Sequence, residues 1–215
     1  MIIYDFFAGT GSATKAFEDA GHTVIKVELD DYFDAHERDI LQLDAHTLIA
    51  KYGHPDFIWA SPPCTTFSVA SLRHYWKQEN GVAVPKNEKT LAGIKLVEHT
   101  VKLIKALNPR IGWVMENPRG MLRKQEVVKD LPRQTVTYCQ YGKSYMKPTD
   151  LWGYVPNWKP RPMCKPGAGC HEFSKRSSRS GLQGALIPGL RRTAVRSMVP
   201  YELGREIYEA INESL

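Results

Sequence analysis

The sequence predicts an α/β fold in which helices cover both faces of a mostly parallel sheet. Short apolar runs of strand length alternate with segments whose apolar residues recur at helical spacing. Glycines and prolines separate these segments, and such alternation is typical of parallel strands joined by helical crossovers. The expected strands cover residues 2–7, 23–27, 57–60, 111–115 and 135–138.

Three helices are expected between and after these strands. The first carries Ala13, Ala16, Phe17 and Ala20 at helical spacing and is followed by Gly21, a typical helix stop. The second is long, and one face of it carries the apolar residues Ile94, Val97, Val101, Ile104 and Leu107. The last closes the chain, with an apolar face formed by Leu203, Ile207, Ala210 and Ile211.

A length of 215 residues suggests one domain with a small appendage. Residues 153–189, rich in proline, glycine, serine and arginine, predict a small basic insert. Residues 1–64 hold four Lys/Arg against eleven Asp/Glu, whereas the remainder holds 25 against 12. This asymmetry suggests two kinds of ligand, the second a polyanion, although chance scatter of charge remains the alternative.

The sequence shows no apolar run of membrane-spanning length and no secretory signal at its start. Four cysteines without such a signal indicate free thiols in a reducing compartment. We therefore expect a cytoplasmic, monomeric protein without a membrane partner.

The first candidate site is the glycine turn Gly9-Thr10-Gly11, with Glu28 at the end of the next strand. Glycines allow close approach of the backbone to a ligand, and an acid about twenty residues on accepts hydrogen bonds from ribose hydroxyls. The GTG spacing, with no basic cluster expected near it, favours an adenosyl cofactor without a pyrophosphate. The alternative is a turn that only packs a helix against a strand.

The second candidate is Pro62-Pro63-Cys64, directly after the strand at 57–60. Two prolines stiffen the exit and present a thiol where open parallel sheets bind ligands. A helix N-terminus pointing at Cys64 would lower its pKa and supply thiolate. The alternative is a buried structural cysteine. Glu116-Asn117 follows the strand at 111–115, where a carboxyl group can donate a proton; an ordinary surface turn is the alternative.

The order of glycine turn, acid, Pro-Pro-Cys and Glu-Asn resembles the DNA (cytosine-5-)methyltransferase family over nearly the whole chain, and in particular its compact phage-borne members. Gln140-Tyr141-Gly142 through Lys147-Pro148-Thr149 resembles the family's basic motif, with Lys147 and Thr149 where arginines are usual. Residues 196–203 resemble its closing motif, which folds back beside the first, although Arg196 stands near the usual asparagine. The insert is smaller than the target-recognition region of most relatives.

The resemblance implies a Rossmann-like S-adenosylmethionine-dependent methyltransferase fold. The catalytic domain would comprise residues 1–152 and 190–215, with 153–189 as the DNA-contacting insert. Cytosine would be flipped out of double-stranded DNA, Cys64 would attack carbon 6, Glu116 would hydrogen-bond the ring, and Asn117 would orient the Cys64 loop. Lys147 joins these as a catalytic candidate.

The remaining candidates follow from the same resemblance. The cofactor-binding candidates for S-adenosylmethionine are Phe7, Gly9, Thr10, Gly11, Glu28, Leu29, Asp39, Ile40 and Pro63. The DNA-binding candidates are Ser68, Arg73, Lys77, Arg119, Lys175, Arg176, Arg179, Arg191 and Arg192. Residues 67–90 would form a loop that closes over the substrate, or else an ordinary exposed connection.

A zinc-binding site is one interpretation of the group Cys164, Cys170 and His171, with Cys139 as a fourth ligand. Their spacing is not a common structural zinc pattern, so the sequence alone favours ordinary thiols. Three alternatives to the function also stay open. An amino-methyltransferase would carry Tyr or Phe where Cys64 stands; one branch of the family methylates transfer RNA with the same motifs; and a silent DNA-binding homologue would keep the fold.

Overall fold

A computed structural model describes residues 1–171, 187 and 189–215. Its centre is a six-stranded sheet in the order β2-β1-β3-β6-β8-β7. The strands are β1 (Ile2–Phe6), β2 (Thr23–Val27), β3 (Phe57–Ala60), β6 (Gly112–Pro118), β7 (Arg133–Thr137) and β8 (Pro148–Tyr154). Neighbours β2, β1, β3 and β6 are parallel, and β8 runs antiparallel between β6 and β7. The predicted α/β fold with a mostly parallel sheet is confirmed.

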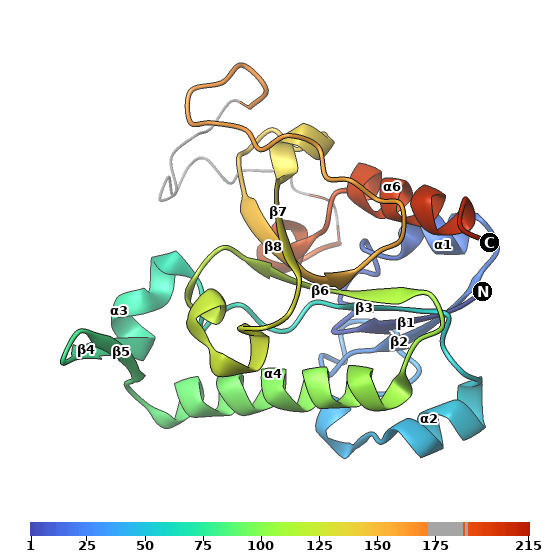
Figure 1. The fold of residues 1–215 in the computed structure, drawn as a ribbon, viewed down its shortest axis with the longest axis horizontal. Helices are drawn as coiled ribbons and strands as arrows, with labels where there is room; N and C mark the ends of the chain where they lie inside the picture. The colour runs from blue at the N-terminus through green and yellow to red at the C-terminus, as the bar shows by residue number, and fades with distance from the viewer. Residues whose placement is uncertain (172–186, 188) are drawn as a thin grey trace.

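Helices pack on both faces of this sheet (Figure 1). Helices α2 (Ala45–Tyr52) and α4 (Glu88–Leu107) lie on one face, and α1 (Lys15–Asp19) and α6 (Tyr201–Asn212) lie on the other. Alternate residues of each strand point to opposite faces, so β1 contributes Tyr4 to the α4 side and Ile3 to the α6 side. Two apolar cores result, and together they fix the positions of the strand ends.

The expected helices are present with shifted bounds. Helix α4 begins at Glu88, where Asn87 accepts a hydrogen bond from the amide of Thr90, and ends before Asn108 in a left-handed conformation. Helix α1 is shorter than expected because the turn continues to Thr14. A further short helix, α5 (Arg192–Ser197), precedes α6. Within the described residues, no helix combines the length and apolar character needed to cross a bilayer.

Three details differ from the sequence prediction. Strand β8 was not expected, and it extends pairing along β6 so that Glu116 and Asn117 lie within that strand, opposite Leu151 and Asp150. Because β8 ends at Tyr154, the regular sheet passes the predicted domain boundary at residue 152 by two residues. Residues 67–90 are also more ordered than a simple loop: they contain α3 (Leu72–Tyr75) and a hairpin of β4 (Trp76–Glu79) and β5 (Val82–Pro85).

Candidate functional site

The candidate residues gather where parallel strands β1, β3 and β6 end. Phe6 of β1 pairs with Ala60 of β3, and Ala60 pairs with Met115 of β6. The glycine turn follows β1, the Cys64 loop follows β3, and Glu116 lies near the end of β6, so all three share one edge of the sheet, where open parallel sheets bind ligands.

The turn after β1 has an unusual backbone. Phe7 has a φ of 61° and Gly9 a φ of 50°, and the amides of Phe7 and Ala8 both donate to the Val27 carbonyl, at 2.8 and 3.1 Å. A non-glycine residue at positive φ is uncommon, and the backbone strain it carries is found mainly at functional sites. Glycine adopts such φ values without steric cost. The turn thus holds the backbone of Phe7 and Gly9 in a left-handed conformation at the strand end, where a glycine lets a ligand approach closely.

Glu28 lies against this turn. One carboxylate oxygen accepts a hydrogen bond from the Gly9 amide at 2.9 Å, and the other accepts from the Asp30 amide at 2.9 Å. An ionised carboxylate has about four acceptor positions, so two such contacts leave capacity for ribose hydroxyls. Glu28 therefore connects the ends of β1 and β2.

A cavity of ≈ 760 Å³ opens beside the turn. Its wall includes Gly9, Thr10 and Ser12 of the turn and Tyr32 and Phe33 from the segment after β2. A volume in this range is typical of cofactor pockets. The amide of Val199 donates to the Ser12 hydroxyl at 2.9 Å, so the closing motif folds back beside the first, as the resemblance implied.

The cavity wall is more basic than the sequence suggested, because Lys15, Lys26 and Lys143 line it. Lys26 pairs with Glu18 at 2.7 Å and Lys15 with Asp19, which partly neutralises two of the three. The expectation that no basic cluster would lie here was wrong: Lys15 and Lys26 flank the motif in sequence, and the fold adds Lys143 from a distant segment.

The other cofactor candidates differ in placement. Gly11 closes the turn, its amide donating to Ala8, and Leu29 is 68% exposed. Asp39 accepts a hydrogen bond from the Leu41 amide at 3.0 Å and so caps a short 3-10 helix. Ile40 is buried in the core on the α4 face, which leaves little of its side chain to contact a ligand. Pro63 is exposed beside Cys64.

The loop carrying Cys64 is held from both sides. The buried Asn117 side chain donates to the Pro62 carbonyl at 2.8 Å, before Cys64. After it, the Phe67 carbonyl accepts from the Met121 amide at 2.7 Å, and Ser68 forms a bridge with Gly120. A Cβ on Gly120 would lie 2.1 Å from the Phe67 oxygen, so only glycine allows this approach.

Glu116 has a buried, polar environment. The Tyr138 hydroxyl donates to its carboxyl group at 2.8 Å, and the Lys147 ammonium lies 4.0 Å from the same oxygen and over the Tyr138 ring. Burial raises the pKa of Glu116 above its ordinary value, while Lys147 and Tyr138 oppose that rise. A carboxyl group in this setting retains a proton more readily than one in water.

Burial also raises the pKa of the Cys64 thiol. Among its neighbours, Lys147 and Arg196 lower this pKa and Glu116 raises it. The lowered value that a helix N-terminus would give is therefore not found, because desolvation outweighs the nearby cations. Cys64, Glu116 and Lys147 thus form one electrostatic group.

The expected DNA-binding residues are dispersed. Ser68 accepts a hydrogen bond from the Ala70 amide at 3.3 Å and caps a short turn, while exposed Arg73 and Lys77 lie on α3 and β4. Lys77 pairs with Glu79 at 2.6 Å. Arg119, partly buried, follows β6, and Arg192 is exposed at the start of α5.

Arg191 was expected to bind DNA, but in the structure it contacts other residues of the protein. It pairs with Asp30 at 3.1 Å and stacks over the Tyr32 ring at the rim of the cavity, so part of its charge is neutralised there. Lys175, Arg176 and Arg179 lie outside the described residues.

Two polar side chains at the site were missed by sequence reasoning. Tyr138, which donates to Glu116, follows the apolar end of β7 and resembles any core aromatic in sequence. Asp5 is buried within β1 and accepts a hydrogen bond from the Thr14 hydroxyl at 2.6 Å, which ties the strand to the end of the turn. An acid inside an apolar strand was the available signal for Asp5.

These features define an α/β protein of the Rossmann-like methyltransferase class. The solved structure of the Entamoeba histolytica methyltransferase EhMeth matches 76% of the chain with a TM-score of 0.53 and 12% identity. The S. pombe Dnmt2 methyltransferase matches 76% of it with a TM-score of 0.47 and 11% identity. The chain spans about half the length of these structures, 56% and 52% respectively.

Sequence comparison identifies the family. Residues 1–135 match the model of a protein family described as "C-5 cytosine-specific DNA methylase". The chain is also 32% identical over 162 residues to the "Probable DNA (cytosine-5)-methyltransferase" of Frog virus 3 (isolate Goorha), covering 73% of each chain. This protein therefore belongs to the C-5 cytosine-specific DNA methylase family, as the sequence motifs indicated.

Proposed function

We propose that this protein transfers a methyl group from S-adenosylmethionine to carbon 5 of cytosine in double-stranded DNA, with Cys64 as the nucleophile. The observation that carries the proposal is the joint placement of three side chains: Cys64 after β3, Glu116 near the end of the parallel neighbour β6, and Lys147 just before β8, 4.0 Å from Glu116. Family membership supports the same chemistry.

The cavity beside the glycine turn fits the cofactor. The close backbone approach at the glycine turn, the carboxylate of Glu28 and the aromatic ring of Tyr32 suit an adenosyl group, and Lys143 suits a carboxylate. When bound there, S-adenosylmethionine supplies the methyl group that carbon 5 accepts. Glu28 would bind the ribose hydroxyls while keeping the turn in place.

Cys64 would act as the attacking group. Cytosine must leave the base stack before the thiolate can reach carbon 6, at a cost of a few kcal/mol. Addition of sulfur to carbon 6 breaks the ring's aromaticity and places electron density on carbon 5. After methylation, loss of the carbon 5 proton and elimination of the Cys64 thiolate restore the ring. Lys147 lowers the pKa of Cys64 and so increases the thiolate fraction.

Glu116 would stabilise the ring during attack. In its protonated form the carboxyl group donates to ring nitrogen 3, and its other oxygen accepts from the exocyclic amine. The bond donated to ring nitrogen 3 strengthens as negative charge develops on the ring, and the contact with the exocyclic amine orients the base. Burial, which raises the pKa of Glu116, favours this form, and the Tyr138 hydroxyl fixes the carboxyl orientation.

Asn117 would be a positioning residue. Its amide donates to the Pro62 carbonyl, two residues before Cys64, and so couples the end of β6 to the loop that carries the thiol. Holding thiolate and ring in register can contribute as much as about 7–11 kcal/mol to the barrier reduction.

The test is nucleoside analysis of plasmid DNA and of RNA from cells that express the protein, together with a DNA-binding assay on the purified protein. The proposal predicts 5-methylcytosine in plasmid DNA from cells with the wild-type chain and none with Cys64→Ala. N4-methylcytosine or N6-methyladenine would instead identify an amino-methyltransferase. Methylcytosine confined to RNA would contradict DNA as substrate, and bound DNA without any modification would indicate a silent homologue.

A further inference from the structure

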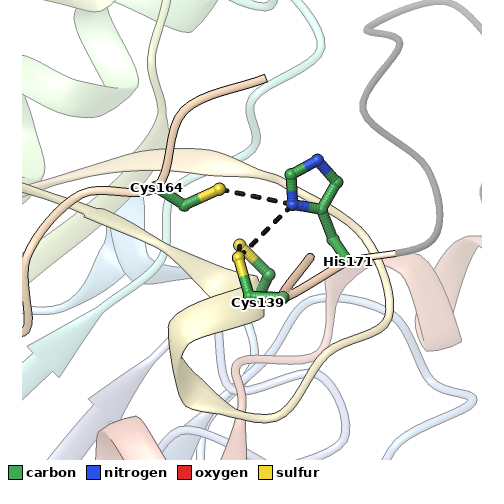
Figure 2. Close-up of side chains that lie close together, drawn as sticks. Cys139, Cys164 and His171 are labelled. Atoms are coloured by element: carbon green, nitrogen blue, oxygen red, sulfur yellow. Dashed lines mark hydrogen bonds between the residues drawn. The ribbon is translucent and has the colours of Figure 1, made fainter. Parts of the chain in front are cut away.

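Four metal-ligand side chains gather in a second cluster, which contains none of the proposed catalytic residues. Cys139, Cys164, Cys170 and His171 place their ligand atoms within 4.8 Å of one another. Cys139 lies in the 3-10 helix Tyr138–Tyr141 that follows β7, whereas the other three come from the segment after β8. Figure 2 shows the labelled side chains of Cys139, Cys164 and His171 directed toward a common centre.

The separations within the cluster match a tetrahedral ion. The sulfurs of Cys139 and Cys170 are 3.8 Å apart, and the Nδ1 atom of His171 lies 3.3 Å from the Cys164 sulfur and 3.5 Å from the Cys170 sulfur. Zinc bonds of about 2.3 Å to sulfur and 2.0–2.1 Å to nitrogen place sulfurs about 3.8 Å apart, and sulfur and nitrogen about 3.6 Å apart.

The same separations do not fit a disulfide. A bonded pair of sulfurs is about 2.05 Å apart, whereas Cys139 and Cys170 are 3.8 Å apart. All four cysteines of the chain are free thiols. Three thiols and an imidazole converging on one point are the ligand set of structural zinc sites, and soft thiolates select zinc over hard cations.

We propose that Cys139, Cys164, Cys170 and His171 bind one structural zinc ion through three thiolates and Nδ1 of the imidazole. Each thiol loses its proton to solvent on binding, so the occupied site carries a net charge of −1. The side-chain amide of Gln140 donates to the Cys170 sulfur at 3.2 Å, a contact that stabilises a thiolate. The segment after β8 that carries Cys164, Cys170 and His171 also contains the basic residues Lys159, Arg161 and Lys165.

The ion would fasten the base of the basic insert to the wall of the active site. The amide of Cys164 already donates to the Thr137 hydroxyl at 3.0 Å, which aligns this segment with the end of β7. Cys139 directly follows Tyr138, whose hydroxyl donates to Glu116. The chain continues from His171 into residues 172–186 of the insert. One ion would therefore connect the insert to the strand end that carries the Glu116 partner.

The sequence names these four residues as candidate ligands but favours ordinary thiols, because their spacing is unusual for a zinc site: they come from both sides of a strand. Cys139 precedes β8 and Cys164 follows it, so 24 residues separate them in sequence. Pairs separated by two to four residues, the usual pattern, do not occur here. Only the antiparallel return of β8 beside β7 brings the two segments together.

Elemental analysis of the purified full-length protein tests the proposal. We expect one zinc per chain in the wild type, and loss of most of it in Cys170→Ser and in His171→Ala. Cys64→Ser is the matched control, because it removes a cysteine outside the cluster and should keep full zinc content while abolishing methyl transfer. The outcome is thus independent of the proposed activity.

Cobalt substitution gives a second readout that does not depend on variants folding. Titrating chelator-treated wild type with Co²⁺ should give the intense visible bands of a tetrahedral site together with thiolate charge-transfer absorption, saturating at one equivalent. Weak octahedral bands would overturn the proposal, as would wild-type zinc content in both cluster variants. A Cys139–Cys170 disulfide in freshly purified protein without metal would also contradict it, and iron in place of zinc would contradict the choice of metal.

Discussion

Replacing Lys147 by methionine removes the ammonium group that lies 4.0 Å from Glu116 and influences Cys64. Methionine keeps most of the side-chain length but removes the ammonium over the Tyr138 ring, so the change acts chiefly through charge. Lys147 lowers the pKa of both Glu116 and Cys64. Its loss should therefore raise both values.

The distance sets the size of the effect. Two unit charges 4 Å apart interact by about 4 kcal/mol at an effective dielectric constant of about 20. Removing the ammonium group therefore removes a substantial stabilisation of the ionised Glu116 carboxylate. The side chain of Lys147 is 20% exposed and that of Glu116 is 7% exposed, so solvent screens only part of this interaction. We therefore expect the pKa of Glu116 to rise in Lys147→Met, and the pKa of Cys64 to rise as well.

The assay is the pH dependence of kcat/KM for methyl transfer to duplex DNA. The two limbs of the profile report the ionisations of Cys64 and Glu116 as an interacting pair. Both limbs should move to higher pH in Lys147→Met, so the rate on the acid side of the profile should fall. Lys95→Met, on the exposed face of α4, is the control and should leave the profile unchanged. A rising limb that stays in place or moves to lower pH would refute the electrostatic role of Lys147.

Three further changes test other parts of the site. Asn117→Ala leaves the Pro62 carbonyl without its partner, so the free energy of unfolding should fall by about 1–3 kcal/mol in denaturant titrations. Adduct formation by Cys64 should slow as well, and an unchanged adduct rate would exclude a positioning role. Glu28→Ala should weaken cofactor binding in calorimetry by about tenfold or more while DNA affinity is kept; the reverse pattern would overturn the cofactor site. Burial raises the pKa of Asp5 from 3.8 to about 7, so the folded state binds more protons between these values and stability should decline as pH rises through them. Asp5→Asn should flatten that decline, which thermal melts at several pH values would show; an equally steep decline would assign it to another group.

Much of the fold was predictable because its strands are short, apolar and bounded by turn residues. The bounds of β2 and β3 agree with the prediction, and the glycine turn lies where the motif placed it. Strand β8 was missed because Asp150 and Thr149 interrupt its apolar pattern. In the structure both are buried, and Asp150 accepts hydrogen bonds from Arg123 and Thr135, which no local pattern encodes.

The residues of the site could be predicted from the sequence, but their burial, hydrogen-bond partners and neighbouring charges could not. Motif order places Cys64 and Glu116 at strand ends, and strand adjacency follows from the parallel sheet. The Tyr138 hydroxyl on Glu116 and the lysines of the cavity depend on long-range packing, so spacing gives no sign of them. The direction of the pKa shift of Cys64 is likewise set by burial, which cannot be read from the local sequence.

The most direct test of the account is covalent trapping on a duplex that contains 5-fluorocytosine. Fluorine at carbon 5 prevents the proton loss that releases the enzyme, so in the presence of S-adenosylmethionine the wild-type protein should form a denaturation-resistant adduct. Peptide mapping should place the bond at Cys64, and Cys64→Ala should form none. An adduct at another cysteine, or no adduct on a duplex whose unfluorinated form the protein methylates, would contradict the account.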